Sequence, residues 1–388
     1  MRNILYFGAT ILLALPAALR AQATDTSKNG VPSDSAATAS STAVPDSSVT
    51  VTFGGFVDGY YAYDFNRPPS IDRSYTTQPA RSNEFNINLA FVEAKVDGSR
   101  VHARLALQAG TSVQSNYAAE PTIGAVSGSS LSRYLQEAYA GYKVADKLWI
   151  DGGIFFSHIG NETWISRDNW TYSRSFVGDF TPYYETGVRA VWSATPKLTV
   201  TGVVVNGWQN ISETNSDKAV GLRLDYALSP AVTISYDNFI GNEQPDTSRS
   251  RARIFNEALL KAQVTSAFGI ELTADYGLQR RAVGDGSDNF YIGAIVGRYS
   301  LNPMVSLNGR VECFSDRGSV LTTVPAGADG FRSGGASIGV DVSPQSRLLW
   351  RTELRGFSAR DRVFPNRSST DPFSKNDGFA VTSLALTI

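Results

Sequence analysis

The feature that most constrains this chain is a two-residue alternation that returns along most of its length. In the segment 147–157, apolar side chains such as Leu148 and Ile150 share one parity, whereas Asp151 lies on the other. Successive side chains of a β-strand point to opposite faces, so the pattern predicts a strand with one apolar and one polar face. A long polar segment follows, and a second alternating strand begins near Tyr184.

The same alternation recurs throughout the rest of the chain. It is found in the segments 53–64, 85–97, 100–108, 220–226, 270–276, 305–312 and 347–355. We expect strands of about 10 to 14 residues, longer than the roughly 5 to 6 residues usual in soluble sheets. Strands of this length suit a tilted crossing of a lipid bilayer.

The connections between these segments alternate in length. Short turns are expected at 97–99, 145–146, 195–196, 229–230, 302–303 and 344–345. Long polar loops are expected at 65–83, 113–131, 159–182, 243–254, 317–330 and 360–375. Short turns on one rim and long loops on the other are typical of a transmembrane β-barrel. Counting the segments gives about sixteen strands, an even number that closes an antiparallel barrel.

The two faces of each strand can then be assigned. Inside lipid every backbone donor and acceptor must pair within the protein, which a closed sheet achieves. We expect Leu, Val, Ile, Ala and the aromatic residues to face lipid, and the charged parity to face the lumen. Tyr61, Trp149, Trp192 and Trp350 lie near segment ends and suit an interfacial aromatic girdle. A soluble β-sandwich or solenoid would show the same alternation, but strand length and the two unequal rims favour the barrel.

The first 48 residues differ from the rest. Residues 1–23 combine Arg2, an apolar run and the small-residue site Ala21-Gln22-Ala23, which predicts a secretory signal peptide. Residues 24–48 are rich in Ser, Thr and Ala and predict a flexible leader rather than a plug domain. Residues 49–388 form the predicted barrel, and nothing in them resembles a spanning helix of about 20 apolar residues.

Composition narrows the function. The formal net charge is −1, which disfavours nucleic acid as a partner. A single cysteine, Cys313, and two histidines, His102 and His158, give no motif for a metal site, and we predict no cofactor. Catalysis is disfavoured, because Ser157 and His158 are neighbours that a strand would point to opposite faces.

Some segments break the pattern. Between Phe85 and Asp97 the phase of the alternation slips near Phe91-Val92, which predicts a β-bulge or an exit from the membrane. The segments 199–207 and 290–301 are apolar on both parities, so their inward faces stay open at this point.

Several motifs resemble one family of bacterial outer-membrane proteins. They are GFVDGYYAYDFNRP (residues 55–68), LQEAYAGYK (135–143) and KLWIDGGIFFSHIGNE (147–162), together with the stretches 172–175 and 206–208. These motifs resemble the OmpL-like putative β-barrel porin-2 family, and they lie within residues 50–241. The resemblance implies a channel in the outer membrane of a Gram-negative-type bacterium. It implies neither a substrate nor particular site residues.

A barrel of sixteen strands is wide enough to leave an aqueous channel, so we expect passive diffusion of small hydrophilic solutes or ions. The predicted pore-lining residues are Arg100, Arg104, Glu137, Asp151, Glu185, Arg189, Arg223, Asp225, Arg310, Glu312, Arg351 and Arg355. Opposed arginines and carboxylates would set ion preference. The alternative is that these charges only pair with one another.

The loop 159–182 is the sharpest candidate for a constriction. It lies between the fifth and sixth predicted strands, and general diffusion porins fold the loop at that position into the pore, so this expectation rests partly on analogy. The predicted constriction residues are Glu162, Arg167, Asp168, Arg174 and Asp179. The alternative is an outward surface loop, as is usual for long loops.

Two other classes of function remain open from sequence. An adhesin or structural barrel would have the same strands without an open pore, and a barrel hydrolase would need a nucleophile beside a base. Outer-membrane lipid is the expected surrounding. A homotrimer is compatible with a barrel of this size, although no residue specifies it.

Overall fold

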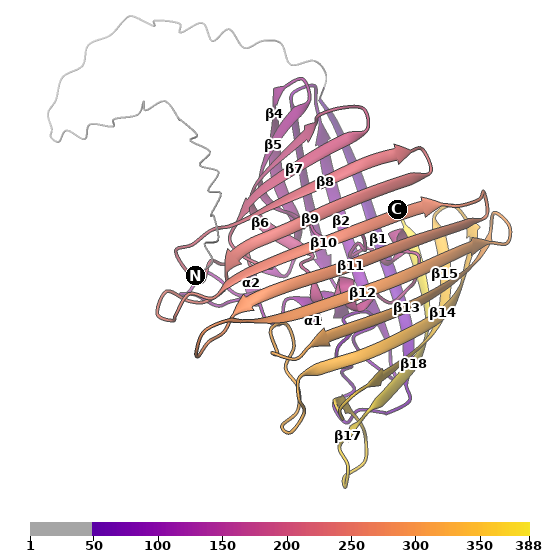
Figure 1. Cartoon of the computed structure of the whole chain (residues 1–388). Helices are drawn as coiled ribbons and strands as arrows, with labels where there is room; N and C mark the ends of the chain where they lie inside the picture. Colours follow the sequence, from indigo (N-terminus) through magenta and orange to yellow (C-terminus); the bar gives the residue numbers. More distant parts are fainter. Residues whose placement is uncertain (1–48) are drawn as a thin grey trace, which may run out of the picture. The chain divides into compact units, whose positions relative to one another are not determined.

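The computed structural model describes residues 49–388, in which sixteen antiparallel strands close into one barrel (Figure 1). The predicted signal peptide (1–23) and leader (24–48) lie outside the described residues. The predicted fold class is confirmed. Within the described part of the chain, no helix is long and apolar enough to cross a membrane.

The barrel strands follow one another in chain order around the wall, and the last pairs with the first. They are β1 (Thr50–Asp64), β2 (Phe85–Asp97), β3 (Val101–Ala109), β4 (Leu135–Ala145), β5 (Leu148–Phe156), β6 (Tyr184–Ser193), β7 (Leu198–Val205), β8 (Ala219–Ser229), β9 (Val232–Asn242), β10 (Ala252–Gln263), β11 (Phe268–Arg280), β12 (Ser287–Ser300), β13 (Val305–Asp316), β14 (Phe331–Gln345), β15 (Leu348–Ala359) and β18 (Asn376–Thr387).

The remaining elements are short and lie in the loops. They are α1 (Thr111–Asn116) and α2 (Ser129–Ser132) after β3, the 3-10 turn η1 (Ser166–Asp168) and α3 (Phe176–Phe180) after β5, and a small hairpin of β16 (Phe364–Pro365) and β17 (Phe373–Ser374) after β15.

The two rims differ as predicted. All six predicted short turns lie at one rim, and a seventh, at 264–267, was not predicted. Long connections such as 65–84, 110–134 and 157–183 lie at the other rim. The first strand begins and the last strand ends at the short-turn rim.

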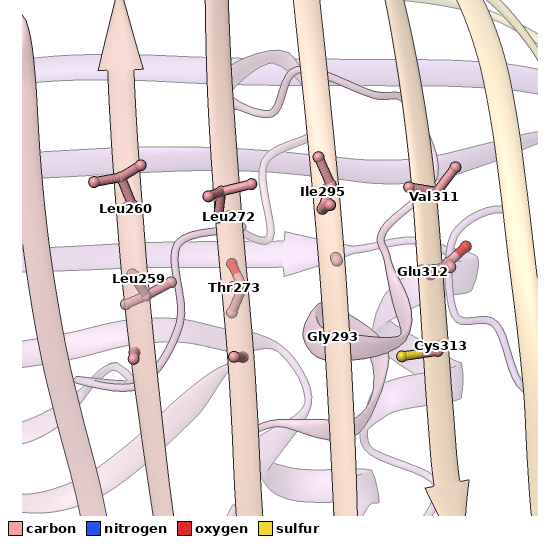
Figure 2. A pocket seen from close by; sticks show the side chains of 12 residues that line it. Leu259, Leu260, Leu272, Thr273, Gly293, Ile295, Val311, Glu312 and Cys313 are labelled. Atoms are coloured by element: carbon pink, nitrogen blue, oxygen red, sulfur yellow. The ribbon is translucent and has the colours of Figure 1, made fainter.

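The outer wall is apolar, as expected for contact with lipid. Leu260, Leu272, Ile295 and Val311 are register partners on four neighbouring strands, and Figure 2 shows them at one level of the wall. Small outward residues beside them, such as Gly293, leave a shallow groove of about 620 Å³. Outward Trp192 and Trp350 remain half exposed, as a girdle requires.

The prediction that aromatic side chains face lipid is wrong for one group of residues, which point into the barrel. Phe239, Phe255, Phe290 and Phe314 share the inward parity of their strands and are almost fully buried inside the barrel. Trp149 also points inward, where its ring stacks on His102 with centroids 4.2 Å apart. Thus the four phenylalanines line the half of the lumen near the long loops, and Trp149 lies near the short-turn rim.

The predicted phase slip in β2 is a β-bulge, three residues before the expected place. Asp58 pairs with Leu89 and the next residue, Gly59, pairs with Ile87, so Asn88 is the extra residue. Asn88 turns inward and donates a hydrogen bond to the Asp58 carboxylate at 2.8 Å. The bulge lets Phe85 face lipid while Glu93, on the same parity, faces the lumen.

Candidate functional site

The loop 157–183 folds into the barrel instead of lying at the surface. Trp164, Tyr172, Arg174 and Phe176 are almost completely shielded from solvent, although the loop contains only η1 and α3 as regular structure. A loop without a ladder of backbone hydrogen bonds needs other partners for its buried polar groups. Inward-facing side chains of the barrel wall supply them.

Arg351 of β15 binds the backbone of this loop at three points. Its guanidinium donates to the carbonyl oxygens of Ser166 (2.5 Å), Asn169 (2.8 Å) and Thr171 (3.3 Å). The same guanidinium pairs with Asp341 of β14 at 2.8 Å. One arginine therefore fixes the loop turn around η1 and neutralises a carboxylate of the wall.

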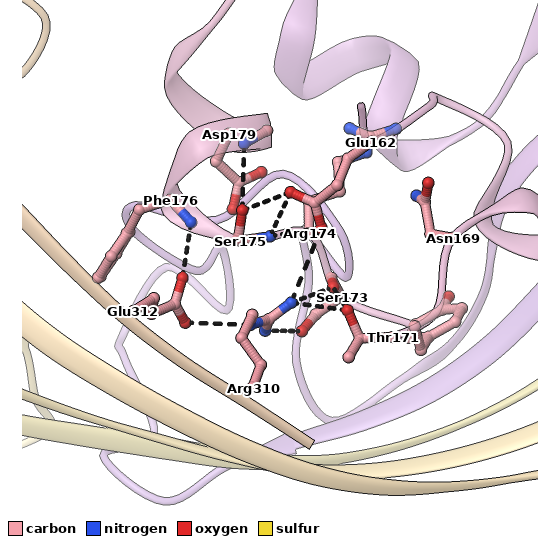
Figure 3. A network of polar contacts seen from close by, with 12 residues as sticks. Glu162, Asn169, Thr171, Ser173, Arg174, Ser175, Phe176, Asp179, Arg310 and Glu312 are labelled. Carbon is pink, nitrogen blue, oxygen red and sulfur yellow. Dashed lines mark hydrogen bonds and ion pairs between the residues drawn. The ribbon is translucent and has the colours of Figure 1, made fainter. Parts of the chain in front are cut away.

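Arg310 and Arg355 hold the next part of the loop, and Figure 3 shows Arg310 beside Ser173 and Glu312. Arg310 donates to the carbonyl of Ser173 at 2.7 Å, and Arg355 donates to the carbonyl of Arg174 at 2.7 Å. Glu312 lies between them, 2.7 Å from Arg355 and 3.3 Å from Arg310. The Phe176 amide donates to Glu312 at 2.7 Å, so this carboxylate also binds the start of α3.

The beginning of the loop is attached to the opposite part of the wall. The Gly160 amide donates to Glu257 of β10 at 2.8 Å, and Arg223 of β8 donates to the Gly160 carbonyl at 2.7 Å. His158 lies 2.9 Å from Glu185 through Nδ1 and 2.8 Å from the Asn238 carbonyl through Nε2. The loop is therefore fixed to both sides of the lumen.

The tip of the loop reaches the short-turn rim. Arg167 donates to the Ser346 carbonyl in the turn between β14 and β15, and to the hydroxyl of Thr387 at the end of β18. Trp170 lies three residues further along the loop, and the Lys261 ammonium of β10 is 5.0 Å from the centre of its ring. Four strands separate β10 from β15 along the wall, so this tip spans part of the bore.

Helix α3 adds apolar contacts to these polar ones. Phe176 packs against Phe314, Phe331 and Phe357, with ring centroids 5.4 to 5.9 Å apart, and Phe180 packs against Phe314 at 4.7 Å. The inward aromatic residues of the wall thus form a hydrophobic core with the loop. Without the loop, these rings would be exposed to water in the lumen.

The predicted constriction residues take different positions. Glu162 accepts from the Ser175 amide at 3.0 Å, and Arg174 is fully buried with its guanidinium 4.1 Å from the Tyr183 ring centre. Arg174 therefore does not face solvent, whereas the Glu162 side chain keeps 12% of its exposure. Asp168 is the exposed member of the five, at the short-turn end of the loop.

Asp179 joins the loop to a second inward loop. Its carboxylate accepts from the amide (3.1 Å) and hydroxyl (2.6 Å) of Thr77 in the connection 65–84. Burial is the main influence on this carboxyl and raises its pKa to about 6. Gln78 of the same connection donates to the Tyr172 carbonyl at 2.7 Å. The sequence predicts a long loop at 65–83, but its inward position was missed, because its polar residues carry no distinguishing pattern.

The predicted pore-lining charges divide into two groups. The first faces the loop and comprises Arg223, Arg310, Glu312, Arg351 and Arg355, together with Glu185, which binds His158 at the start of the loop. The second lies on β3–β6 and pairs along the wall: Arg104 with Glu137 and with Glu93 of β2, and Arg189 with Asp151 at 2.8 Å.

Two predicted pore residues stand apart from these groups. Asp225 pairs with Arg223 of its own strand at 3.0 Å. Arg100 lies in the short turn between β2 and β3 and is exposed, so it sits at the rim rather than along the bore.

The two histidines are already engaged by neighbours. Both ring nitrogens of His158 have partners, and Ser157 donates to Glu185 at 3.2 Å rather than to the imidazole. His102 lies 2.6 Å from Asp151. Between residues 49 and 388, no group of three or more His, Cys, Asp or Glu side chains is arranged to hold a metal ion.

Solved outer-membrane proteins share this fold. An anion-selective porin from Comamonas acidovorans has a TM-score of 0.57 at 8% identity, covering 88% of this chain and 100% of that one. The channel DcaP of Acinetobacter baumannii has a TM-score of 0.60 at 13% identity, covering 88% and 97%. The trimer form of OmpT from Vibrio cholerae has a TM-score of 0.57 at 10% identity, covering 88% and 100%.

The family comparison is more specific than the fold. A search of curated proteins finds no match. The family model described as "Putative beta-barrel porin-2, OmpL-like" matches residues 50–387, which is the whole barrel. The chain therefore belongs to the OmpL-like, putative β-barrel porin-2 family, and it is a porin-like channel of the outer membrane.

Proposed function

We propose that this channel carries small hydrophilic solutes or ions by passive diffusion across the outer membrane of a Gram-negative-type bacterium. We further propose that the loop 157–183 is its constriction. The observation that carries the proposal is the attachment of this loop to both sides of the lumen, through His158 at Glu185 of β6 and through Ser166 at Arg351 of β15. A loop fixed in this way narrows the bore without moving during passage. No catalytic role is proposed for any residue.

The solute path is proposed to follow the wall of β2–β6. There the side chains of Lys95, Arg104 and Arg189 retain 45%, 14% and 19% of their exposure, whereas those of Arg310 and Arg355 at the loop retain none. Water reaches the first group and not the second. We therefore assign the first group to the pore surface and the second to anchoring the loop.

The entrance is proposed to lie among the long loops. A cavity of about 340 Å³ is lined there by Asp179, Trp208, Glu243 and Arg253, among other residues. Burial raises the pKa of Glu243 as it does that of Asp179. Both carboxyls therefore become neutral at a higher pH than free side chains do, which makes the entrance sensitive to mild acid.

A homotrimer is proposed by analogy, since one of the similar structures is OmpT in its trimer form. Outer-membrane lipid would then surround the assembly. Chemical cross-linking of the purified protein in detergent tests this state, and a single band at monomer mass would exclude it.

Solute permeation tests the channel directly. Proteoliposomes containing the full barrel are diluted into isotonic arabinose, glucose, sucrose or raffinose, and swelling is followed by light scattering. We expect swelling rates that fall steeply with sugar size, because a narrowed bore excludes larger solutes. Equal swelling of protein-free and protein-containing liposomes would contradict the proposal.

A structural barrel or adhesin is the second candidate, and the packing at the loop end of the barrel favours it. Tyr117 and Tyr184 stack with centroids 4.4 Å apart, and Trp164 packs against both. These rings close part of the lumen beneath the long loops. In that case liposomes would not swell with any sugar, while the protein would still insert and unfold cooperatively.

A further inference from the structure

A second cavity, of about 700 Å³, lies on the outside of the barrel at the long-loop rim. It is formed by the connection 65–84 and by the connection between β15 and β18. Tyr63, Arg67, Ile71, Asn83 and Arg367 are among its lining residues. Tyr63 is on the lipid-facing parity of β1, so this cavity opens outward and is separate from the lumen.

The two arginines of this cavity have no protein partner. Within residues 49–388, neither the Arg67 nor the Arg367 guanidinium forms an ion pair or a side-chain hydrogen bond, and both residues are exposed. The nearby carboxylates Asp72 and Glu84 are both engaged by Arg81, at 2.5 and 2.6 Å. The cavity therefore presents net positive charge.

The backbone around the cavity is held in an unusual conformation. Arg67, Ile71 and Asn83 have left-handed φ angles of 50°, 66° and 60°. This conformation is unfavourable for a β-branched residue such as Ile71, and such strain is maintained only when the surroundings impose it. The Arg367 amide donates to the Asn66 carbonyl at 3.1 Å, which ties the two connections together.

An apolar surface continues from the cavity toward the membrane. Tyr61, Phe85 and Ile87 face outward from β1 and β2, and Phe85 retains 86% of its exposure. A ligand that fits both the cavity and this apolar surface has an anionic head group, which binds the two arginines, and acyl chains, which pack against the apolar surface. Guanidinium groups bind phosphate through paired hydrogen bonds, more specifically than they bind other anions.

We propose that this cavity binds a phosphorylated lipid of the outer leaflet, with Arg67 and Arg367 holding a phosphate and the Phe85–Ile87 wall holding an acyl chain. The long-loop rim is the outer side of such a barrel, and basic pockets at membrane surfaces bind lipid headgroups. The site lies outside the lumen and does not depend on solute passage.

The test uses the purified full barrel in detergent with bisphosphorylated lipid A as the probe, and lipid retention is measured by native mass spectrometry. The double variant Arg67→Gln/Arg367→Gln is expected to weaken lipid A binding at least about tenfold. The matched control Arg249→Gln/Arg360→Gln removes two exposed arginines of the same rim that do not line the cavity. It is expected to bind lipid A like the unmodified protein.

Three results would overturn the proposal. They are an equal loss of binding in the control variant, undiminished binding of dephosphorylated lipid A, and binding of inorganic pyrophosphate as strong as that of lipid A. Single-channel conductance of the double variant is measured in parallel and is expected to be unchanged, so a folding failure or a blocked pore is distinguished from loss of the lipid site.

Discussion

At the residue scale, the inward arginines of β13 and β15 bind the backbone of the loop 157–183. The side chain of Arg310 is fully buried and lies 3.2 Å from Glu353 and 3.3 Å from Glu312. Removing one partner of a buried ion pair leaves an uncompensated charge, which is far more costly than removing one partner of a surface pair.

We therefore predict that Arg310→Met lowers the free energy of unfolding by about 3 to 5 kcal/mol. Arg281→Met is the matched control, because Arg281 pairs with Asp288 at 2.9 Å but keeps 51% of its side-chain exposure. That variant should lose no more than about 1 kcal/mol. Urea unfolding in detergent micelles measures both, and equal losses would show that burial does not matter at Arg310.

His158 gives a pH dependence with a definite sign. Burial lowers its pKa, but the Glu185 carboxylate and the two hydrogen bonds outweigh burial and raise the pKa above the usual 6.5. The folded protein then binds more protons than the unfolded chain, so stability falls as pH rises. The contribution is complete below about pH 6.5 and is lost as pH rises through the folded pKa.

We expect hydrogen exchange in the loop 157–183 to accelerate as pH rises above about 6.5, after correction for the intrinsic exchange rate. His158→Gln should flatten this corrected profile. A variant profile identical to that of the unmodified protein would mean that His158 does not hold the loop.

At the element scale, the loop 157–183 forms one hydrophobic core with the inward side chains of the barrel wall. Its length and charges could be read from the sequence, and so could its place between the fifth and sixth strands. The aromatic residues of the wall that pack against the loop could not be read from the sequence. Phe290 lies in a segment that is apolar on both parities, and Phe239 is an ordinary apolar residue until the loop is known to pack nearby. Sequence periodicity identifies two faces but does not say what covers each of them.

Helix α3 provides the element-scale prediction. Phe176→Ala should destabilise the docked loop by about 3 to 5 kcal/mol, because it leaves a cavity among Phe314, Phe331 and Phe357. Increased protease cleavage within residues 157–183 and larger current noise are expected. Phe85→Ala, on the lipid face, is the control and should alter neither measurement.

At the scale of the whole molecule, strand alternation and the two unequal rims were enough to predict the closed barrel. The bulge at Asn88 could be placed only within a few residues, because either end of an apolar run can absorb an extra residue. The contacts of Arg351 with three loop carbonyls could not be predicted, since no local pattern links β15 to a loop almost 200 residues away.

The lipid-facing assignment can be tested by one substitution. Ile295 is a half-exposed outward residue of β12, near the middle of the outer wall. Ile295→Arg should destabilise the folded barrel in bilayers by about 2 to 4 kcal/mol. Val283→Arg makes the same change in an exposed residue of the long-loop rim and should have little effect. A similar small effect at both positions would argue against lipid contact at Ile295.

The most direct test of a channel narrowed by its own loop is single-channel conductance in planar bilayers, measured for the unmodified protein and for a deletion of residues 167–175. We predict discrete conductance steps for the unmodified protein and clearly larger steps for the deletion, because the deleted segment reaches from the β14–β15 turn toward Trp170 and β10. Absence of steps in the unmodified protein, or steps of unchanged size after the deletion, would contradict the account.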